Sequence, residues 1–204
     1  MIIEKYSARL FSDSPVWKDV EEGVLNYSNW DTTVMYDTRF KLCLVKNKGI
    51  YLRMRTNETD LRKEVSDRDG SVWEDSCMEF FFKPFDDCDE YINIEMNPVG
   101  AYLSAIGSNR DNRVFLKEIT DICPVVSTEI NSEGWSLELF VPFELINAVF
   151  KNKNFENINL FRANFYKCGD KTNKIHYHSF SKMTTLPPGF HNPECFGLVE
   201  VKER

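Results

Sequence analysis

A tryptophan and a glutamate in the stretch of residues 72–83 have the residue types and the spacing that a sugar-binding site requires. Side chains alternate between the two faces of a β-strand, so Met78 and Phe80 face one way and Glu79 the other. An indole ring offers an apolar platform for the C–H face of a pyranose, and a carboxylate accepts hydrogen bonds from hydroxyl groups. The alternative is that Trp73 is a core side chain at the entrance of the strand, which is an ordinary place for a tryptophan.

Alternation of apolar and polar residues predicts about nine short, mostly antiparallel strands. The best helix candidate is residues 142–150, which begin with a proline at a position where its missing N–H costs nothing. This pattern predicts an all-β fold, an antiparallel β-sandwich or jelly roll with one short helix, as a single domain over residues 1–204. Residues 1–37 are expected to be irregular, with Trp17 and Trp30 covering one end of the core and binding no ligand.

Three of the predicted strands should contribute to one core. Their apolar residues fall on a single face of each strand: Met78, Phe80, Phe82, Ile92, Ile94, Met96, Phe161, Ala163 and Phe165. Burying side chains of this kind stabilises a fold by roughly 1.5–3 kcal/mol each. The opposite face of the same strands carries polar residues, so we expect a pocket where that face meets the loops.

Composition excludes several classes of partner. The net charge is -7 and the basic residues are scattered, whereas nucleic acids and anionic membranes require a basic patch. No segment approaches the run of about 18–20 apolar residues that a membrane helix requires. The N-terminus lacks the apolar region of a signal peptide, so we expect a cytoplasmic protein with six reduced cysteines. An exported form with a different start is left open.

Residues 73–81, with Trp73, Asp75, Ser76 and Glu79, resemble the W-x-D-D-S-x-E-h-h stretch of family 9 carbohydrate-binding modules, which occur beside xylanases and in free-standing family 9-like proteins. Further similarity to the family 9-like group covers residues 40–42, 52–55, 97–100, 162–170 and 190–197. The resemblance therefore runs from about residue 38 to residue 200. It implies a β-sandwich that binds a sugar, often at a chain end, between two aromatic rings.

The resemblance also implies particular site residues. Trp73 matches the family's tryptophan and Glu79 its downstream carboxylate. The second ring is expected at Phe180, where the family usually has tryptophan. Apart from the resemblance, His176 is expected to line the same pocket and not to bind a metal. Four more polar candidates are chosen for their chemistry alone: Asn97, Arg110, Arg113 and Tyr177. The expected partner is a mono- or oligosaccharide, and the sequence gives no oligomeric state.

No cofactor or metal is expected. His176, His178, His191 and Cys195 are residue types that zinc accepts, but their spacing is not that of a zinc site. Structural calcium is found in the xylanase-borne modules. No complete calcium loop stands out in this sequence, so this property is not carried over from the resemblance, and whether a structural calcium is bound stays open.

Two other functions remain open at this stage. Glu79 and Glu95 lie on same-face positions of successive predicted strands and could be the two carboxylates of a glycan-active enzyme. The structural alternative pairs these acids with arginines, for which Arg53, Arg55 and Arg162 are candidates. The chain could also be an interaction module whose sugar site has decayed, as phenylalanine at position 180 suggests.

Overall fold

The structure is a computed structural model that describes all residues except 1–2, 31, 33, 152 and 204. In this part of the chain one α-helix, α1 (Phe143–Val149), accompanies fourteen strands. The strands are β1 (Lys5–Phe11), β2 (Gly23–Val24), β3 (Tyr27–Ser28), β4 (Thr38–Val45), β5 (Gly49–Thr56), β6 (Cys77–Lys83), β7 (Tyr91–Met96), β8 (Tyr102–Gly107), β9 (Arg113–Phe115), β10 (Val125–Asn131), β11 (Gly134–Pro142), β12 (Leu160–Cys168), β13 (Tyr177–Ser179) and β14 (Gly197–Lys202). Single 3-10 turns lie at Trp17–Asp19, Val72–Glu74, Leu116–Glu118 and Pro193–Cys195.

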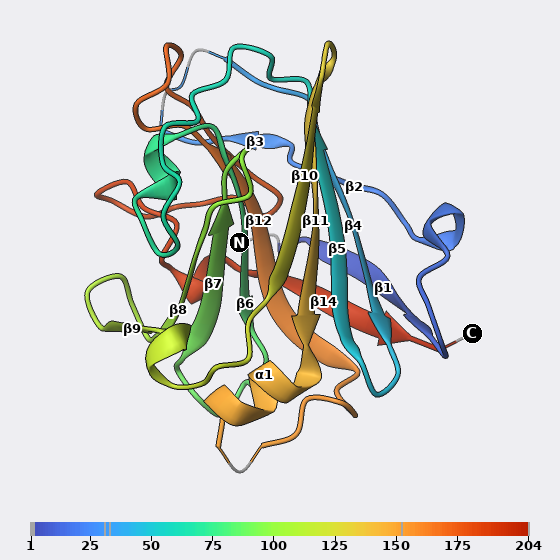
Figure 1. The fold of residues 1–204 in the computed structure, drawn as a ribbon. Coiled ribbons are helices and arrows are strands. Elements are labelled where there is room, and N and C mark those ends of the chain that lie inside the picture. The colour runs from blue at the N-terminus through green and yellow to red at the C-terminus, as the bar shows by residue number, and fades with distance from the viewer. Residues whose placement is uncertain (1–2, 31, 33, 152, 204) are drawn as a thin grey trace.

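All of these strands belong to one mixed, curled sheet. Its main order is β10-β11-β5-β4-β1-β14-β12-β6-β7-β8-β9, with β2 beside β4 and with β13 between β12 and β3. Most neighbours are antiparallel, but β1 runs parallel to both β4 and β14 at the middle of the sheet. The curl brings β10, β11, β5 and β4 over against β6, β7 and β12, and α1 lies at one end (Figure 1). The predicted all-β fold with one short helix is confirmed.

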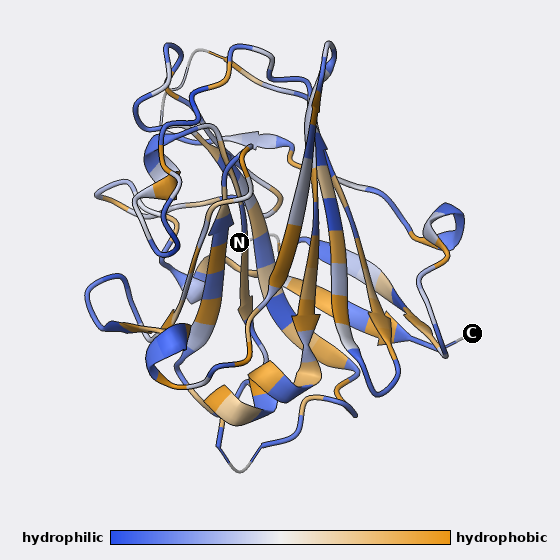
Figure 2. Cartoon of the chain, viewed as in Figure 1, coloured by the Kyte–Doolittle hydropathy of each residue, from blue (hydrophilic) through white to orange (hydrophobic). Residues whose placement is uncertain are grey.

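The two halves of the curled sheet enclose a single large apolar cluster. Residues of β4, β5 and β11 from one half and of β6, β7 and β12 from the other belong to it. All nine residues that the alternation assigned to this core are in the cluster, and each is at most 2% exposed. The same alternation is visible along the strands in Figure 2. The prediction of the buried face of β6, β7 and β12 is therefore confirmed.

Strand β1 corrects the expectation that residues 1–37 are irregular. Tyr6 and Ala8 are buried on one side of β1, and the Tyr6 hydroxyl accepts a hydrogen bond from the backbone N–H of Leu42 at 2.9 Å. The alternation of Tyr6 and Ala8 with polar residues is a strand signal, but tyrosine and alanine are weak markers of burial.

Within the described residues, no helix is long and apolar enough to span a membrane.

The outer face of β6 and β7 is not open to solvent. A second apolar cluster covers it, built from residues of these strands together with Phe190, Cys195 and Phe196 of the C-terminal segment. Cys77, which faces outward, is fully buried. The loops that cover this face thus form a second layer, and the space between them and the strands contains the site described next.

Candidate functional site

A pocket of about 120 Å³ lies over the outer face of β6, β7 and β12. Aromatic rings and charged side chains line it together. Its residues are Trp30, Trp73, Glu79, Glu95, Arg110, Arg113, Cys168, Asp170, Tyr177, Pro188, Gly189, Phe190 and His191. Pockets of mixed apolar and hydrogen-bonding character are the usual sites for small ligands.

Trp73 is held at the pocket by the end of β12. It lies in the 3-10 turn Val72–Glu74, directly before β6, and its side chain is half-buried. The backbone N–H of Asp170 donates to the Trp73 carbonyl at 3.2 Å, and that of Lys171 donates to the Glu74 carbonyl at 3.0 Å. These two backbone hydrogen bonds hold the turn in place. The part of the Trp73 ring that stays exposed lines the pocket.

Trp30, near the N-terminus, packs against the C-terminal part of the chain. Its indole Nε1–H donates to the Thr185 carbonyl at 3.0 Å, and its ring packs against Tyr177 and Phe190, with ring centroids 5.5 and 5.3 Å away. Its φ is 57°, a left-handed conformation that is rare for a bulky residue. Strained backbone of this kind is concentrated at functional sites, so the conformation of Trp30 is consistent with a functional role for the pocket that its ring lines.

Two carboxyl groups form the pocket floor. Glu79 on β6 and Glu95 on β7 are register partners, which places their side chains next to each other on the outer face. Asn93 Nδ2 donates to Glu95 Oε1 at 2.9 Å, and Arg113 Nη1 lies 3.6 Å from the same oxygen. Glu95 Oε2 is buried and has no hydrogen-bond partner among the described residues. An unpaired buried acceptor costs free energy, and a ligand hydroxyl would satisfy it.

The floor favours neutral carboxyl groups. Burial, followed by repulsion from Glu95, raises the pKa of Glu79 well above its usual value. Burial raises the pKa of Glu95 to about 7, against the opposing attraction of Arg113. A protonated carboxyl group both donates and accepts hydrogen bonds, as a sugar hydroxyl does, so these two groups can pair with hydroxyls in either direction.

His191 links the floor to a neighbouring wall. Arg113 Nη1 lies 3.3 Å from His191 Nε2, and the Tyr91 hydroxyl lies 2.7 Å from His191 Nδ1. A guanidinium only donates, so Nε2 accepts, and in the neutral ring Nδ1 carries the proton that Tyr91 accepts. Burial, followed by repulsion from Arg113, lowers the pKa of His191 to about 3. The neutral imidazole therefore orients Arg113 over the floor.

The sequence of this chain matches a known family over nearly its whole length. The family model described as "Carbohydrate-binding family 9" matches residues 16–201. The chain belongs to carbohydrate-binding family 9. Among curated proteins, none is similar enough in sequence to count as a relative.

Solved structures agree with the family 9 fold. A protein from Bacteroides uniformis, described as a candidate carbohydrate-binding protein, is 24% identical with a TM-score of 0.83, and the match covers 98% of this chain and 100% of that one. A family 9 module from Caldicellulosiruptor kristjanssonii in complex with cellotriose is 15% identical with a TM-score of 0.71, covering 98% and 95%. The glucose complex of a family 9 module from that organism is also 15% identical, with a TM-score of 0.67 and coverage of 97% and 96%.

Five of the site residues expected from the family 9 resemblance or from their chemistry lie together. They are Trp73, Glu79, Arg110, Arg113 and Tyr177, and all of them line the pocket. Arg110 is exposed at the rim, whereas Glu79 is 2% exposed at the floor. Residues that are up to about a hundred positions apart in the sequence, and that were expected to share a site, therefore line one pocket.

Three expected site residues lie elsewhere, and the first is the expected second ring. Phe180 is in the main core, with its ring centroid 5.1 Å from that of Phe40 and 5.9 Å from that of Phe165. It follows directly after β13, and its backbone N–H donates to the Phe165 carbonyl, so its side chain turns inward. This corrects the expectation that Phe180 walls the pocket.

Asn97 and His176 are structural. The Asn97 amide donates to the Val65 carbonyl at 2.7 Å and to Asp75 Oδ2 at 2.9 Å, which holds the loop before β6. His176 is fully buried, with Nε2 2.6 Å from Lys167 Nζ and Nδ1 2.7 Å from the Lys174 carbonyl. Neither residue lines the pocket. The hydrogen bonds of both side chains are made with other groups of the protein.

Sequence reasoning missed several residues that line the pocket. Trp30 was expected to bind no ligand, and Asp170, Phe190 and His191 were not assigned to the site. Trp30 reaches the pocket because β3 pairs with β13, about 150 residues later, a contact without any local signal. Phe190 and His191 fall within a segment that resembles the family 9-like group, which was the one sequence signal for them.

The arginines expected to pair with the floor are also elsewhere. Arg53 pairs with Glu138, Arg55 with Glu22, and Arg162 with Asp86. None of these three arginines lines the pocket, and the cation that reaches Glu95 is Arg113 instead. Since Arg113 approaches only one carboxyl oxygen, the floor is not a closed ion pair.

A second hollow, of about 450 Å³, lies over β4, β5 and β11. Trp17 lies at this hollow, under the guanidinium of Arg53, whose central carbon is 4.3 Å from the ring centroid. Several of its charged groups are paired, as in the Arg39–Glu22 and Arg53–Glu138 bridges. Among the described residues that line it, the buried side-chain atom without a hydrogen-bond partner is a donor, Arg53 Nε, and not an acceptor such as Glu95 Oε2 in the pocket lined by Trp30 and Trp73.

Proposed function

We propose that this chain is a non-catalytic carbohydrate-binding protein, and that Trp73 and Trp30 provide the aromatic surfaces of its sugar pocket. The sugar's hydroxyl groups bond to the floor carboxyls and to Arg113. The observation that carries this proposal is the buried, unpaired Oε2 of Glu95 at the floor of a pocket lined by two tryptophans. Membership in family 9 supports the same ligand class.

The polar groups of the pocket match the chemistry of a sugar. Each hydroxyl of a pyranose donates one hydrogen bond and accepts others, and the pocket offers guanidinium donors together with carboxyl groups that do both. The rings supply apolar contact area at a low cost in conformational entropy. The module from Caldicellulosiruptor kristjanssonii was crystallised with cellotriose and with glucose, so these two sugars are the first ligands to test.

The test compares two tryptophan variants by sugar titration calorimetry and thermal unfolding. Trp73→Ala should weaken binding of cellotriose or glucose by more than about 2 kcal/mol, roughly thirtyfold, because the ring is a pocket wall. The matched control is Trp17→Ala, which removes an equally half-buried ring at the other hollow and should leave the affinity unchanged. A Trp73→Ala protein that binds as tightly as the parent would refute the proposal.

Glycoside hydrolysis is the second candidate, because two carboxyl groups with raised pKa lie in one pocket. In glycosidases the two carboxyls flank the scissile bond, whereas Glu79 and Glu95 are direct cross-strand neighbours on the same floor. Their Cβ atoms are expected to be roughly 4.5–5.5 Å apart, and both side chains project from the same floor and not from opposite sides of a bound sugar. Incubation with cello-oligosaccharides should therefore release no shorter products, and release that is lost in Glu79→Gln would establish the enzyme instead.

A further inference from the structure

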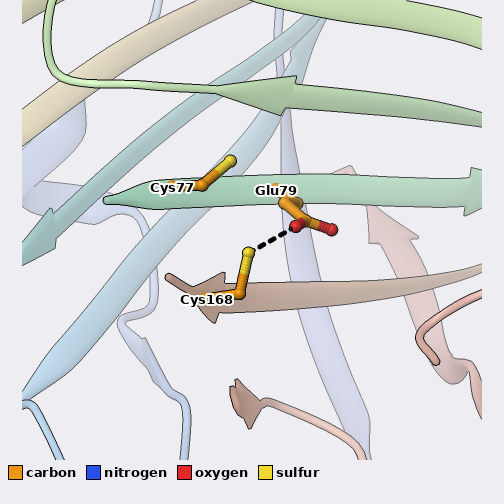
Figure 3. A group of neighbouring side chains, drawn as sticks. All are labelled: Cys77, Glu79 and Cys168. Carbon is orange, nitrogen blue, oxygen red and sulfur yellow. Dashed lines mark hydrogen bonds between the residues drawn. The ribbon is translucent and has the colours of Figure 1, made fainter. Parts of the chain in front are cut away.

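Two cysteines and a glutamate meet at one side of the pocket floor. Cys77 and Glu79 lie two residues apart on the outer face of β6, and Cys168 on β12 is the register partner of Cys77. The two Sγ atoms and a carboxyl oxygen of Glu79 all lie within 4.8 Å of one another. Figure 3 shows the three side chains between the two strands, with Cys168 Sγ 2.9 Å from Glu79 Oε1. The sheet register therefore produces this cluster.

The arrangement is close to what a zinc-like ion requires. Zinc binds thiolate sulfur at about 2.3 Å and carboxylate oxygen at about 2.0–2.2 Å in a tetrahedron, which places neighbouring ligand atoms roughly 3.5–3.8 Å apart. The present separations, from 2.9 Å between Cys168 Sγ and Glu79 Oε1 to at most 4.8 Å, differ from these values by about 1 Å. Thiolate ligands select soft or borderline metals over calcium and magnesium, so the residue types also define the class of ion.

The polar side chains of this cluster have few strong partners within the protein. Glu79 is buried, it faces Glu95 on the neighbouring strand, and its hydrogen bond from Cys168 comes from a thiol, which is a weak donor. Arg113 approaches the other carboxyl, Glu95, at 3.6 Å. A divalent cation bound to two thiolates and one carboxylate would compensate this concentration of acidic groups.

The cluster is also open on one side. Glu79 and Cys168 line the pocket, whereas Cys77 is buried behind them. Three protein ligands with a fourth position open to a cavity is the arrangement of zinc sites that accept water or an exogenous ligand, in contrast to closed structural sites. An ion in this cluster would therefore be reachable from solvent through the pocket.

We propose that Cys77, Glu79 and Cys168 form a binding site for a thiophilic divalent cation of the zinc class, with its fourth coordination position facing the pocket. Binding displaces the two thiol protons and, where Glu79 is protonated, a third proton, so that two thiolates and one carboxylate bind the ion. The site does not depend on the proposed sugar function. Because Glu79 belongs to both, metal and sugar affinities should be coupled.

The direct test is a titration of the reduced protein with Co²⁺, followed by Zn²⁺ in competition with a chromophoric chelator, in the absence of sugar. We expect one ion per chain, with a thiolate-to-cobalt charge-transfer band that Zn²⁺ abolishes. Cys77→Ser and Cys168→Ser should each weaken Zn²⁺ binding by at least about 100-fold, since they remove direct ligands. The matched control is Cys43→Ser, a fully buried cysteine in a separate apolar cluster, which should bind Zn²⁺ as the parent does.

The unmodified protein decides the question if the serine variants fail to fold. Saturating Zn²⁺ should raise its thermal midpoint, because an ion that binds only the folded state stabilises it. Absence of a thiolate-to-cobalt band in the unmodified protein would overturn the proposal. Undiminished Zn²⁺ binding in folded Cys77→Ser and Cys168→Ser proteins would overturn it as well. Because no sugar is present, these results leave the sugar proposal untouched.

Discussion

Two clusters of buried titratable groups lie on opposite faces of the end of β12, and they differ in how completely the protein pairs them. On the inner side, the sealed network consists of Glu58, Lys167 and His176, all fully buried. Lys167 Nζ lies 2.8 Å from Glu58 Oε2 and 2.6 Å from His176 Nε2, and the Ser76 hydroxyl donates to Glu58 Oε1 at 2.9 Å. Each charge therefore has a partner from the protein itself.

On the outer side, the pocket floor of Glu79, Glu95 and Cys168 is incompletely paired. Two carboxyls face each other, Arg113 approaches one oxygen, and Glu95 Oε2 has no partner among the described residues. Lys167 and Cys168 are consecutive residues, so the alternation of the strand alone assigns one to each cluster. Buried polar groups that the protein itself pairs contribute to the fold, and buried polar groups left without a partner beside a cavity are available for a ligand.

The largest expected effect comes from opening the sealed network. Lys167→Met should lower the free energy of unfolding by about 3–5 kcal/mol, because it leaves Glu58 as a buried charge without its cation. Lys171→Met is the matched control: Lys171 pairs with Glu74 at 2.9 Å on the surface, and its loss should cost less than about 1 kcal/mol. Urea denaturation measures both. Equal losses in the two variants would remove the distinction between the clusters.

The second effect concerns the pocket side. Trp30→Ala should weaken sugar binding by about 2 kcal/mol or more while changing the free energy of unfolding by less than Lys167→Met does, because the ring is only half-buried. Titration calorimetry and urea denaturation on the same preparation provide the two numbers. A variant that loses stability but keeps its affinity would place Trp30 with the structural residues.

A smaller effect tests the charge state of the floor. The folded-state pKa of Glu95 is raised to about 7, above its unfolded value near 4.5, so its contribution to stability is present at low pH and is lost as pH rises through 7. Glu95→Gln removes this dependence. The variant's stability relative to the parent should therefore increase by about 1–2 kcal/mol between pH 5 and pH 8. Urea denaturation across this range measures it, and a difference that falls with pH would contradict the raised pKa.

The smallest expected change is at Phe180. Because this ring lies in the main core, Phe180→Leu should cost less than about 1.5 kcal/mol of stability and leave sugar affinity within twofold of the parent. Titration calorimetry tests this directly. A large loss of affinity with intact stability would return Phe180 to the pocket wall.

Much of this architecture was predictable because it depends on local alternation. The buried face of β6, β7 and β12 follows from a period of two, and that period also assigns Glu79 to the outer face. Family resemblance then identified Trp73. The partner of each strand was not predictable, since pairing of β1 with both β4 and β14 joins segments that are distant in the sequence.

The rest of the site depends on such distant pairings. Trp30 reaches the pocket through the contact of β3 with β13, and the register of β12 against β6 brings Cys168 opposite Cys77. Phe180 was assigned to the pocket because it matches the position of the second ring in the family 9 resemblance, and a sequence match does not fix which way a side chain faces. The backbone hydrogen bond from Phe180 to Phe165 decides its direction, and the sequence carries no signal for that bond.

The four tryptophans of the chain report directly on where a sugar binds. Their indole N–H resonances can be followed by NMR while the protein is titrated with glucose or cellotriose. We expect saturable shifts at Trp30 and Trp73, which line the pocket. We expect no shift at Trp135, whose Nε1–H donates to Glu58 in the sealed network, or at Trp17 in the second hollow. Shifts at Trp17 with none at Trp30 and Trp73 would contradict the proposed sugar pocket.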